Sequence, residues 1–142
     1  MSELDICLEI IEKIENRSYR GKNRVVITLD DVASLVDFFA EADGEDQTVI
    51  KECISENVGR VLISFTGNMA KKAVEFEDKK WLERALLIHI LEDIQFDDRE
   101  NLQELFLLNP AFESLNISKD EICNNVMHLA SDRVKKYLLS RF

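Results

Sequence analysis

Proline and glycine are scarce in this 142-residue chain, which contains one proline and four glycines. Because these residues interrupt helices and form many turns, their scarcity favours long helices over many short strands. Apolar residues make up 46% of the chain and charged residues 32%, which is typical of folded proteins and not of disordered ones. The length suits one compact core, so we expect residues 1–142 to form a single helical domain.

Long apolar runs are also absent, and no stretch of about 18 apolar residues predicts a transmembrane helix. The N-terminal MSELDICLEIIEK begins with acidic residues and lacks a basic region, so we do not expect a secretory signal. Cys7, Cys53 and Cys123 are odd in number and far apart, which argues against a disulfide framework or a CxxC metal site. We therefore expect three reduced core thiols in a cytoplasmic protein.

The familiar catalytic and phosphate-binding motifs are missing from the sequence. Gly59 and Gly67 fit neither GxGxxG nor GxxxxGK[ST], and the chain contains no GxSxG, HExxH or CxxC. The absence of these motifs argues against the familiar enzyme classes but does not exclude an enzyme. We expect no bound cofactor.

Apolar residues at helical spacing predict a first helix that ends near Asn16. Val25–Leu29 is β-branched but has no second strand to pair with, so we interpret it as an extended lead-in to the next helix. Thr28 is the expected N-cap of that helix. Asp43-Gly44 is its expected end, with the glycine in the left-handed conformation.

Helical periodicity continues from Val49 to Val74, where Gly59 and Gly67-Asn68 are the candidate breaks between two helices. The next segment, Trp81–Ile94, is apolar around nearly its whole circumference. A helix of this kind belongs in the middle of a bundle.

The C-terminal third predicts further helices. Leu105 and Phe106 are expected to face the core, and Asn109-Pro110 to stop or restart their helix. The capping box Ser118–Glu121 opens a last helix that continues through Leu138.

These segments predict an all-α fold, either a single-domain multi-helix bundle or a short α-α superhelix, with six to eight helices and no significant sheet. The helix rhythm of Trp81–Leu115 resembles HEAT or armadillo repeats, which are protein-interaction scaffolds. The resemblance covers about a quarter of the chain and depends on rhythm alone, since no repeat signature recurs at a fixed period.

Acidic residues exceed basic ones, and the net charge of −10 is unevenly distributed. Asp30–Glu56 contains nine carboxylates and one base, and Glu92–Glu121 contains nine carboxylates and two bases. This polarity is poorly suited to nucleic-acid phosphate and better suited to a basic protein. We interpret the basic segment Arg17–Arg24 as a solvated loop, and we expect binding to neither nucleic acid nor membrane.

Two kinds of residue are candidates for contact with a protein partner. Several carboxylates serve helix starts, which leaves the remaining ones for a partner. The run Leu105–Leu108 is more apolar than one helix face needs, so it is either fully buried or partly a docking patch. The candidate partner-binding residues are the following acidic and aromatic side chains: Glu41, Asp43, Glu45, Asp46, Glu52, Glu56, Glu92, Glu104, Phe106 and Phe112.

The first functional hypothesis is a non-enzymatic cytoplasmic interaction domain with an acidic surface. One concrete version is a bacterial immunity or inhibitor protein that neutralises a basic toxin, since opposite charge accelerates association. A homo-oligomeric scaffold is a further hypothesis.

The alternative is an enzyme or divalent-metal protein centred on His89. Asp93 lies one helical turn after His89 and could orient the imidazole as a general base. Asp93, Asp97 and Asp98 are candidate oxygen ligands. The competing interpretations are a structural histidine in the core and acids that cap a helix start.

Overall fold

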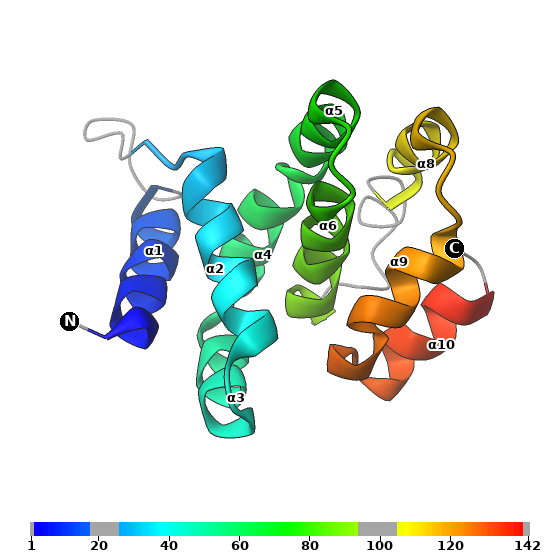
Figure 1. Cartoon of the computed structure of the whole chain (residues 1–142). Helices are drawn as coiled ribbons and strands as arrows, with labels where there is room; N and C mark the ends of the chain where they lie inside the picture. The colour runs from blue at the N-terminus through cyan, green and yellow to red at the C-terminus, as the bar shows by residue number, and fades with distance from the viewer. Residues whose placement is uncertain (1, 18–25, 94–104, 141–142) are drawn as a thin grey trace.

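The computed structural model describes residues 2–17, 26–93 and 105–140, and every regular element within them is helical (Figure 1). The all-α multi-helix bundle expected from the sequence is confirmed. The elements are α1 (Glu3–Arg17), α2 (Leu29–Glu41), α3 (Gly44–Cys53), α4 (Glu56–Ile63), α5 (Thr66–Phe76), α6 (Lys80–Leu91), α8 (Asn109–Leu115), α9 (Lys119–Val126), the 3₁₀ turn η2 (Met127–Leu129) and α10 (Asp132–Ser140).

Helix α6 lies at the centre of the bundle. Figure 1 shows α1 and α2 at one end of the molecule and α8, α9 and α10 at the other, with α6 between them. α6 packs against α2, α4, α5 and α9. In a linear repeat stack each unit would contact only its neighbours in sequence. Contacts from α6 to helices far before and after it in the chain therefore favour a bundle.

The sequence of α6 explains this position. Its buried residues fall on every side of the helix: Trp81, Leu82, Ala85, Leu86, Leu87, Ile88, His89, Ile90 and Leu91. A helix that is apolar all round must be covered on all sides, and the neighbouring helices cover it. The buried apolar residues of the described chain form one continuous cluster from Cys7 to Leu138.

The start of α2 agrees with the sequence prediction. The Asp31 backbone N–H donates to Thr28 Oγ1 at 3.1 Å, and the Thr28 N–H donates to Asp31 Oδ2 at 3.1 Å. These reciprocal bonds form a capping box. The preceding residues 26–28 belong to no strand, and Ile27 is buried, as expected for an extended lead-in that packs on the helix.

The predicted left-handed glycine after α2 is wrong. The Asp43 carboxylate instead accepts a hydrogen bond from the Asp46 backbone N–H at 2.9 Å, which caps α3. Gly44 is the first residue of α3, and its φ is not positive. Asp43 therefore begins a new helix directly after α2, and no glycine-based stop is needed.

The predicted breaks at Gly59 and Gly67 are also wrong, because both glycines lie inside helices, α4 and α5. The chain breaks between α3 and α4 and again between α4 and α5, which gives three helices where two were expected. Ser55 begins α4 by accepting a hydrogen bond from the Val58 N–H at 3.2 Å. Gly59 serves close packing, since a Cβ there would lie 2.8 Å from Glu92 Cγ.

The C-terminal elements agree with the sequence in part. Asn109-Pro110 starts α8, and Ser118 caps α9 through the Glu121 N–H at 3.2 Å, both as predicted. The prediction of a single last helix is wrong, because η2 separates α9 from α10. Ser131 accepts a hydrogen bond from the Val134 N–H at 3.2 Å and so begins α10.

Two glycine variants test the packing at the centre. Gly59→Ala should lower the free energy of unfolding by about 1 kcal/mol net, because overpacking against the buried Glu92 outweighs the gain in helix propensity. Gly44→Ala is the matched control, since a Cβ there meets nothing within 4 Å, and it should leave stability unchanged or raised. Urea unfolding followed by circular dichroism measures both. If Gly59→Ala is instead stabilised as much as Gly44→Ala, Glu92 moves aside at no cost and the packing argument is wrong.

Candidate protein-binding surfaces

Of the residues predicted for catalysis or metal binding, His89 lies in the last turn of α6 and Asp93 lies two residues after its end. His89 is fully buried, so a substrate could reach it only if the core opened. The Asp93 carboxylate accepts a hydrogen bond from Arg133 Nη2 of α10 at 2.7 Å, an ion pair that the sequence did not reveal. Asp97 and Asp98 lie outside the described residues. Within the described parts of the chain, no group of three or more histidine, cysteine or acidic residues is placed to hold a metal ion.

Two residues that were predicted to bind a partner are buried, so the prediction is corrected for them. Glu92 is 1% exposed and Phe112 is 3% exposed, so neither belongs to a surface. Phe106 is 44% exposed, which contradicts its expected inward orientation but keeps it as a surface candidate. Glu104 lies outside the described residues.

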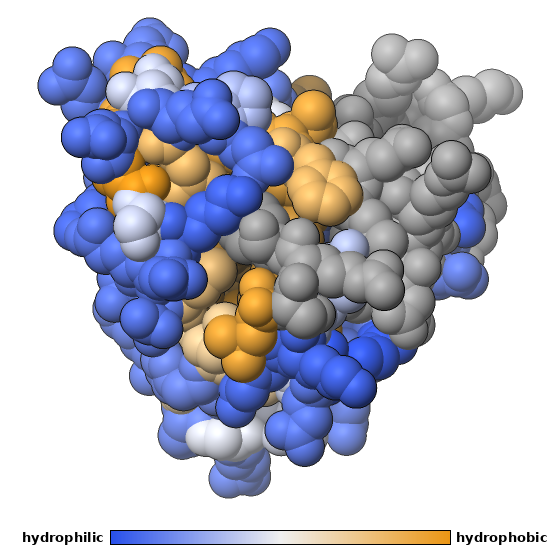
Figure 2. Space-filling view, turned by 90° about the vertical axis from the view of Figure 1, so that its right-hand side faces the viewer, coloured by the Kyte–Doolittle hydropathy of each residue, from blue (hydrophilic) through white to orange (hydrophobic). Residues whose placement is uncertain are grey.

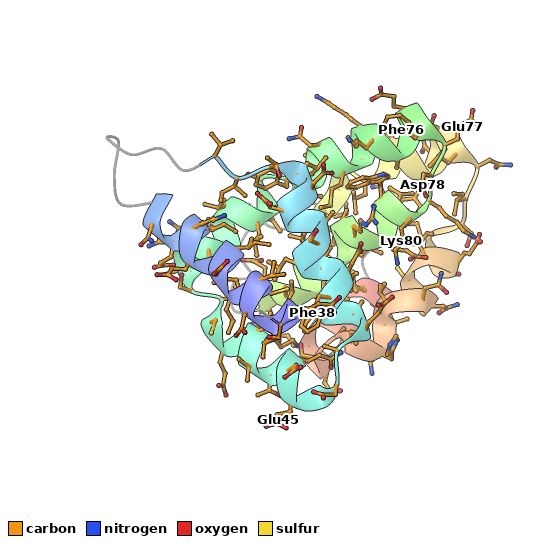
Figure 3. The ribbon with its side chains drawn as sticks, turned by 60° about the vertical axis from the view of Figure 1, so that its left-hand side comes forward. Phe38, Glu45, Phe76, Glu77, Asp78 and Lys80 are labelled. Atoms are coloured by element: carbon orange, nitrogen blue, oxygen red, sulfur yellow. The ribbon has the colours of Figure 1, made fainter. Side chains whose placement is uncertain are left out.

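The predicted acidic residues of α2, α3 and α4 lie at the surface, with Asp46 half-buried. Asp43 is committed to capping α3, and Glu56 pairs with Arg60 at 3.7 Å. The exposed side chains that remain are Glu41, Glu45 and Glu52. Figure 3 shows Glu45 at the outer end of the molecule, pointing away from the helices.

Helix α1 enlarges this acidic surface, because it packs against both α2 and α3. We call the exposed carboxylates of these three helices the acidic end; they are Glu3, Asp5, Glu9, Glu12, Asp30, Glu41, Asp43, Glu45 and Glu52. The bases described with their side chains on α1–α3 are Lys13 and Lys51, and Lys51 lies over the Phe39 ring at 5.9 Å. The contribution of α1 was not predicted from the sequence, although its acidic residues Glu3, Asp5, Glu9 and Glu12 are evident there.

A groove of about 350 Å³ lies between α1 and α2 within the acidic end. We call it the α1/α2 groove; it is lined by Glu3, Ile6, Cys7, Ser34, Asp37, Phe38 and Glu41. The Asp37 carboxylate accepts hydrogen bonds from Arg84 Nε at 3.0 Å and Nη2 at 2.9 Å. This bidentate pair ties the wall of the groove to the central helix α6.

A larger, more apolar groove of about 570 Å³ lies between α5 and α8. We call it the α5/α8 groove; it is lined by Gly67, Ala70, Lys71, Val74, Glu75, Leu107, Pro110, Ala111 and Ser114. Leu107 is 50% exposed, whereas Leu105 and Leu108 are fully buried. Neither Phe106 nor Phe112 lines this groove, and of the predicted apolar run Leu105–Leu108 only Leu107 does.

Acidic and basic side chains are mixed on the surface of the described residues outside the acidic end. Figure 3 shows Phe76, Glu77, Asp78 and Lys80 at the turn between α5 and α6, where two acids are followed by two bases. Figure 2 views the side that carries the C-terminal helices and shows apolar side chains within hydrophilic surroundings. None of the described helices has both the length and the apolarity needed to cross a bilayer.

The cysteines differ in burial, and the expectation of three core thiols is wrong for Cys53, which is exposed. Burial, together with the nearby Glu3 carboxylate, raises the pKa of the Cys7 thiol to about 11. Burial and the Asp120 carboxylate raise the pKa of the Cys123 thiol to about 11, against an opposing effect of Lys119. All three thiols are free.

Thiol labelling tests this difference. At pH 8 a thiol with a pKa near 11 is ionised to the order of one part in a thousand, so Cys7 and Cys123 should react with dithionitrobenzoate far more slowly than Cys53. We expect one rapidly reacting thiol per native chain, and none in Cys53→Ser. In denaturant, all three thiols of the wild-type chain should react rapidly. The slow phases should accelerate as the pH approaches 11. Equally fast reaction of Cys7 and Cys53 at pH 8 would contradict the burial of the groove wall.

Comparison with known proteins adds no family to this description. No protein-family model matches the chain, and neither a curated protein nor a solved structure matches it. The charges and apolar surfaces of the chain itself are therefore what bears on its function.

Proposed function

We propose that this protein is a non-enzymatic cytoplasmic interaction domain whose acidic end binds a basic protein. The observation that carries the proposal is the gathering of exposed carboxylates on three packed helices, α1, α2 and α3. Their mutual repulsion works against a compact fold, and a predominantly negative surface of this kind attracts molecules of the opposite charge.

Helix capping explains only some of these carboxylates. Asp30 lies in the first turn of α2 and Asp43 at the N-cap of α3, where the helix dipole favours negative charge. Glu41 is the last residue of α2, and Glu52 precedes the last residue of α3, where the dipole disfavours negative charge. The last turn of α2 contains no base to offset Glu41. These two carboxylates do not benefit the helices that carry them, which supports a role in binding.

One concrete version of the proposal is an inhibitor or immunity protein that neutralises a basic toxin. Charge complementarity accelerates the encounter of two such proteins and selects against acidic competitors. Three free cysteines support a reducing compartment.

A matched pair of triple variants tests the proposal. Glu41→Gln/Glu45→Gln/Glu52→Gln removes three charges from the acidic end, and Glu75→Gln/Glu77→Gln/Glu113→Gln removes three exposed charges elsewhere. We expect the wild-type chain to capture a basic protein from lysate of the source organism at low salt and to release it at high salt. The first variant should associate at least about tenfold more slowly, because it has lost electrostatic steering, and the second should match the wild type.

Stability provides the control for this experiment. Neutralising Glu41 and Glu52 should leave the free energy of unfolding unchanged or raise it by a few tenths of a kcal/mol, since both lie at unfavourable helix ends. Binding would then fall while stability does not. Equal loss of binding in both triple variants, or capture that does not depend on salt, would exclude the acidic end as the binding surface.

A further inference from the structure

The α1/α2 groove combines an apolar wall with an acidic rim. Ile6 is 44% exposed although its side chain is fully apolar, and it lines the groove together with Phe38. Figure 3 shows Phe38 beside the N-terminal half of α1. The described lining residues include three carboxylates and no base. Arg84 binds one of them, Asp37, which leaves Glu3 and Glu41 at the exposed rim.

This combination limits the chemistry of an occupant. A segment with basic side chains alone would pair with Glu3 and Glu41 but leave Ile6 in water. A segment with apolar side chains alone would remove water from the two carboxylates without supplying a partner, which is costly. A ligand that satisfies both parts of the groove has a bulky apolar group flanked by positive charges.

We propose, on the basis of the function proposed above, that the α1/α2 groove receives one bulky apolar side chain from a lysine- or arginine-rich segment of the basic partner. Glu3 and Glu41 pair with the flanking cations, while Ile6 and Phe38 contact the apolar side chain. The volume of about 350 Å³ lies at the lower end of the range for ligand pockets, which suits a side chain better than a large cofactor.

Contacts within the chain hold both walls of the groove in place. Cys7 is 2% exposed and forms part of a packed wall, and the Asp37–Arg84 pair fixes the α2 side to α6. A preformed site loses little conformational freedom on binding, so its contacts contribute more fully to affinity.

Two labelled lysine-rich peptides test the inference with the full chain. They are identical except that one has a central tryptophan and the other has glycine in its place. Fluorescence anisotropy at low salt should show the tryptophan peptide binding about tenfold more tightly, because one large apolar side chain leaves water. Both affinities should decrease with salt to the same extent, since the charges are equal.

Two serine variants locate the tryptophan preference. Ser34→Trp fills the α1/α2 groove without changing charge and should bring the two affinities to within about twofold of each other. Ser114→Trp is the matched control, because it fills the α5/α8 groove from another exposed helical serine and should keep the tenfold preference. Ile6→Ser removes apolar wall without adding bulk and should also reduce the preference. Urea unfolding checks that each variant is folded.

Several results would overturn the inference. If both peptides bind the wild type with equal, salt-sensitive affinity, the result supports the acidic end as the binding surface and excludes the α1/α2 groove as the site of an apolar side chain. Loss of the preference in Ser114→Trp would assign it to the α5/α8 groove. A wild-type dimer that Ser34→Trp dissociates in sedimentation would identify a second copy as the occupant. Binding of neither peptide, together with failure of the triple-variant experiment, would remove the proposed function as well.

Discussion

The burial of α6 on every side is the constraint on which the rest of the structure depends. No single neighbouring helix can cover a helix whose buried residues fall on every side, so α2, α4, α5 and α9 pack around it from different parts of the chain. The Arg84–Asp37 pair adds a polar link from α6 to α2, and the Arg84 guanidinium lies over the Trp81 ring at 4.4 Å. The outer helices α1 and α3 then pack on α2, which sets the acidic end apart from the centre.

Local signals in the sequence predicted the features that depend on local chemistry. Thr28 and Ser118 cap helices as expected, and the predicted segment Trp81–Ile94 covers the central helix except for its first residue. The division of residues 49–74 was wrong because glycine was treated as a breaker, whereas Gly59 provides space for Glu92. Ser55 is a residue type favoured at helix N-caps, and it was the overlooked signal for the break between α3 and α4.

The candidate site was harder to predict, because it depends on packing between segments far apart in sequence. Charge counted along the chain identified Glu41, Glu45 and Glu52, but it also selected Glu92, which is buried against α4. The same count omitted the acids of α1, which reach the site only because α1 packs on α2 and α3. Neither groove has a sequence pattern, since each forms between two helices. Whether an acid is exposed depends on burial and on which helices pack together, and the spacing of residues along the sequence does not give this information.

Hydrogen–deuterium exchange of the full chain, with and without the captured basic partner, tests the central claim most directly. If the acidic end binds the partner, exchange should slow only in α1, α2 and α3, and most strongly in residues of the α1/α2 groove. High salt should remove this protection. Protection centred on α8, α9 and α10, or protection that persists unchanged at high salt, would contradict the assignment of binding to the acidic end.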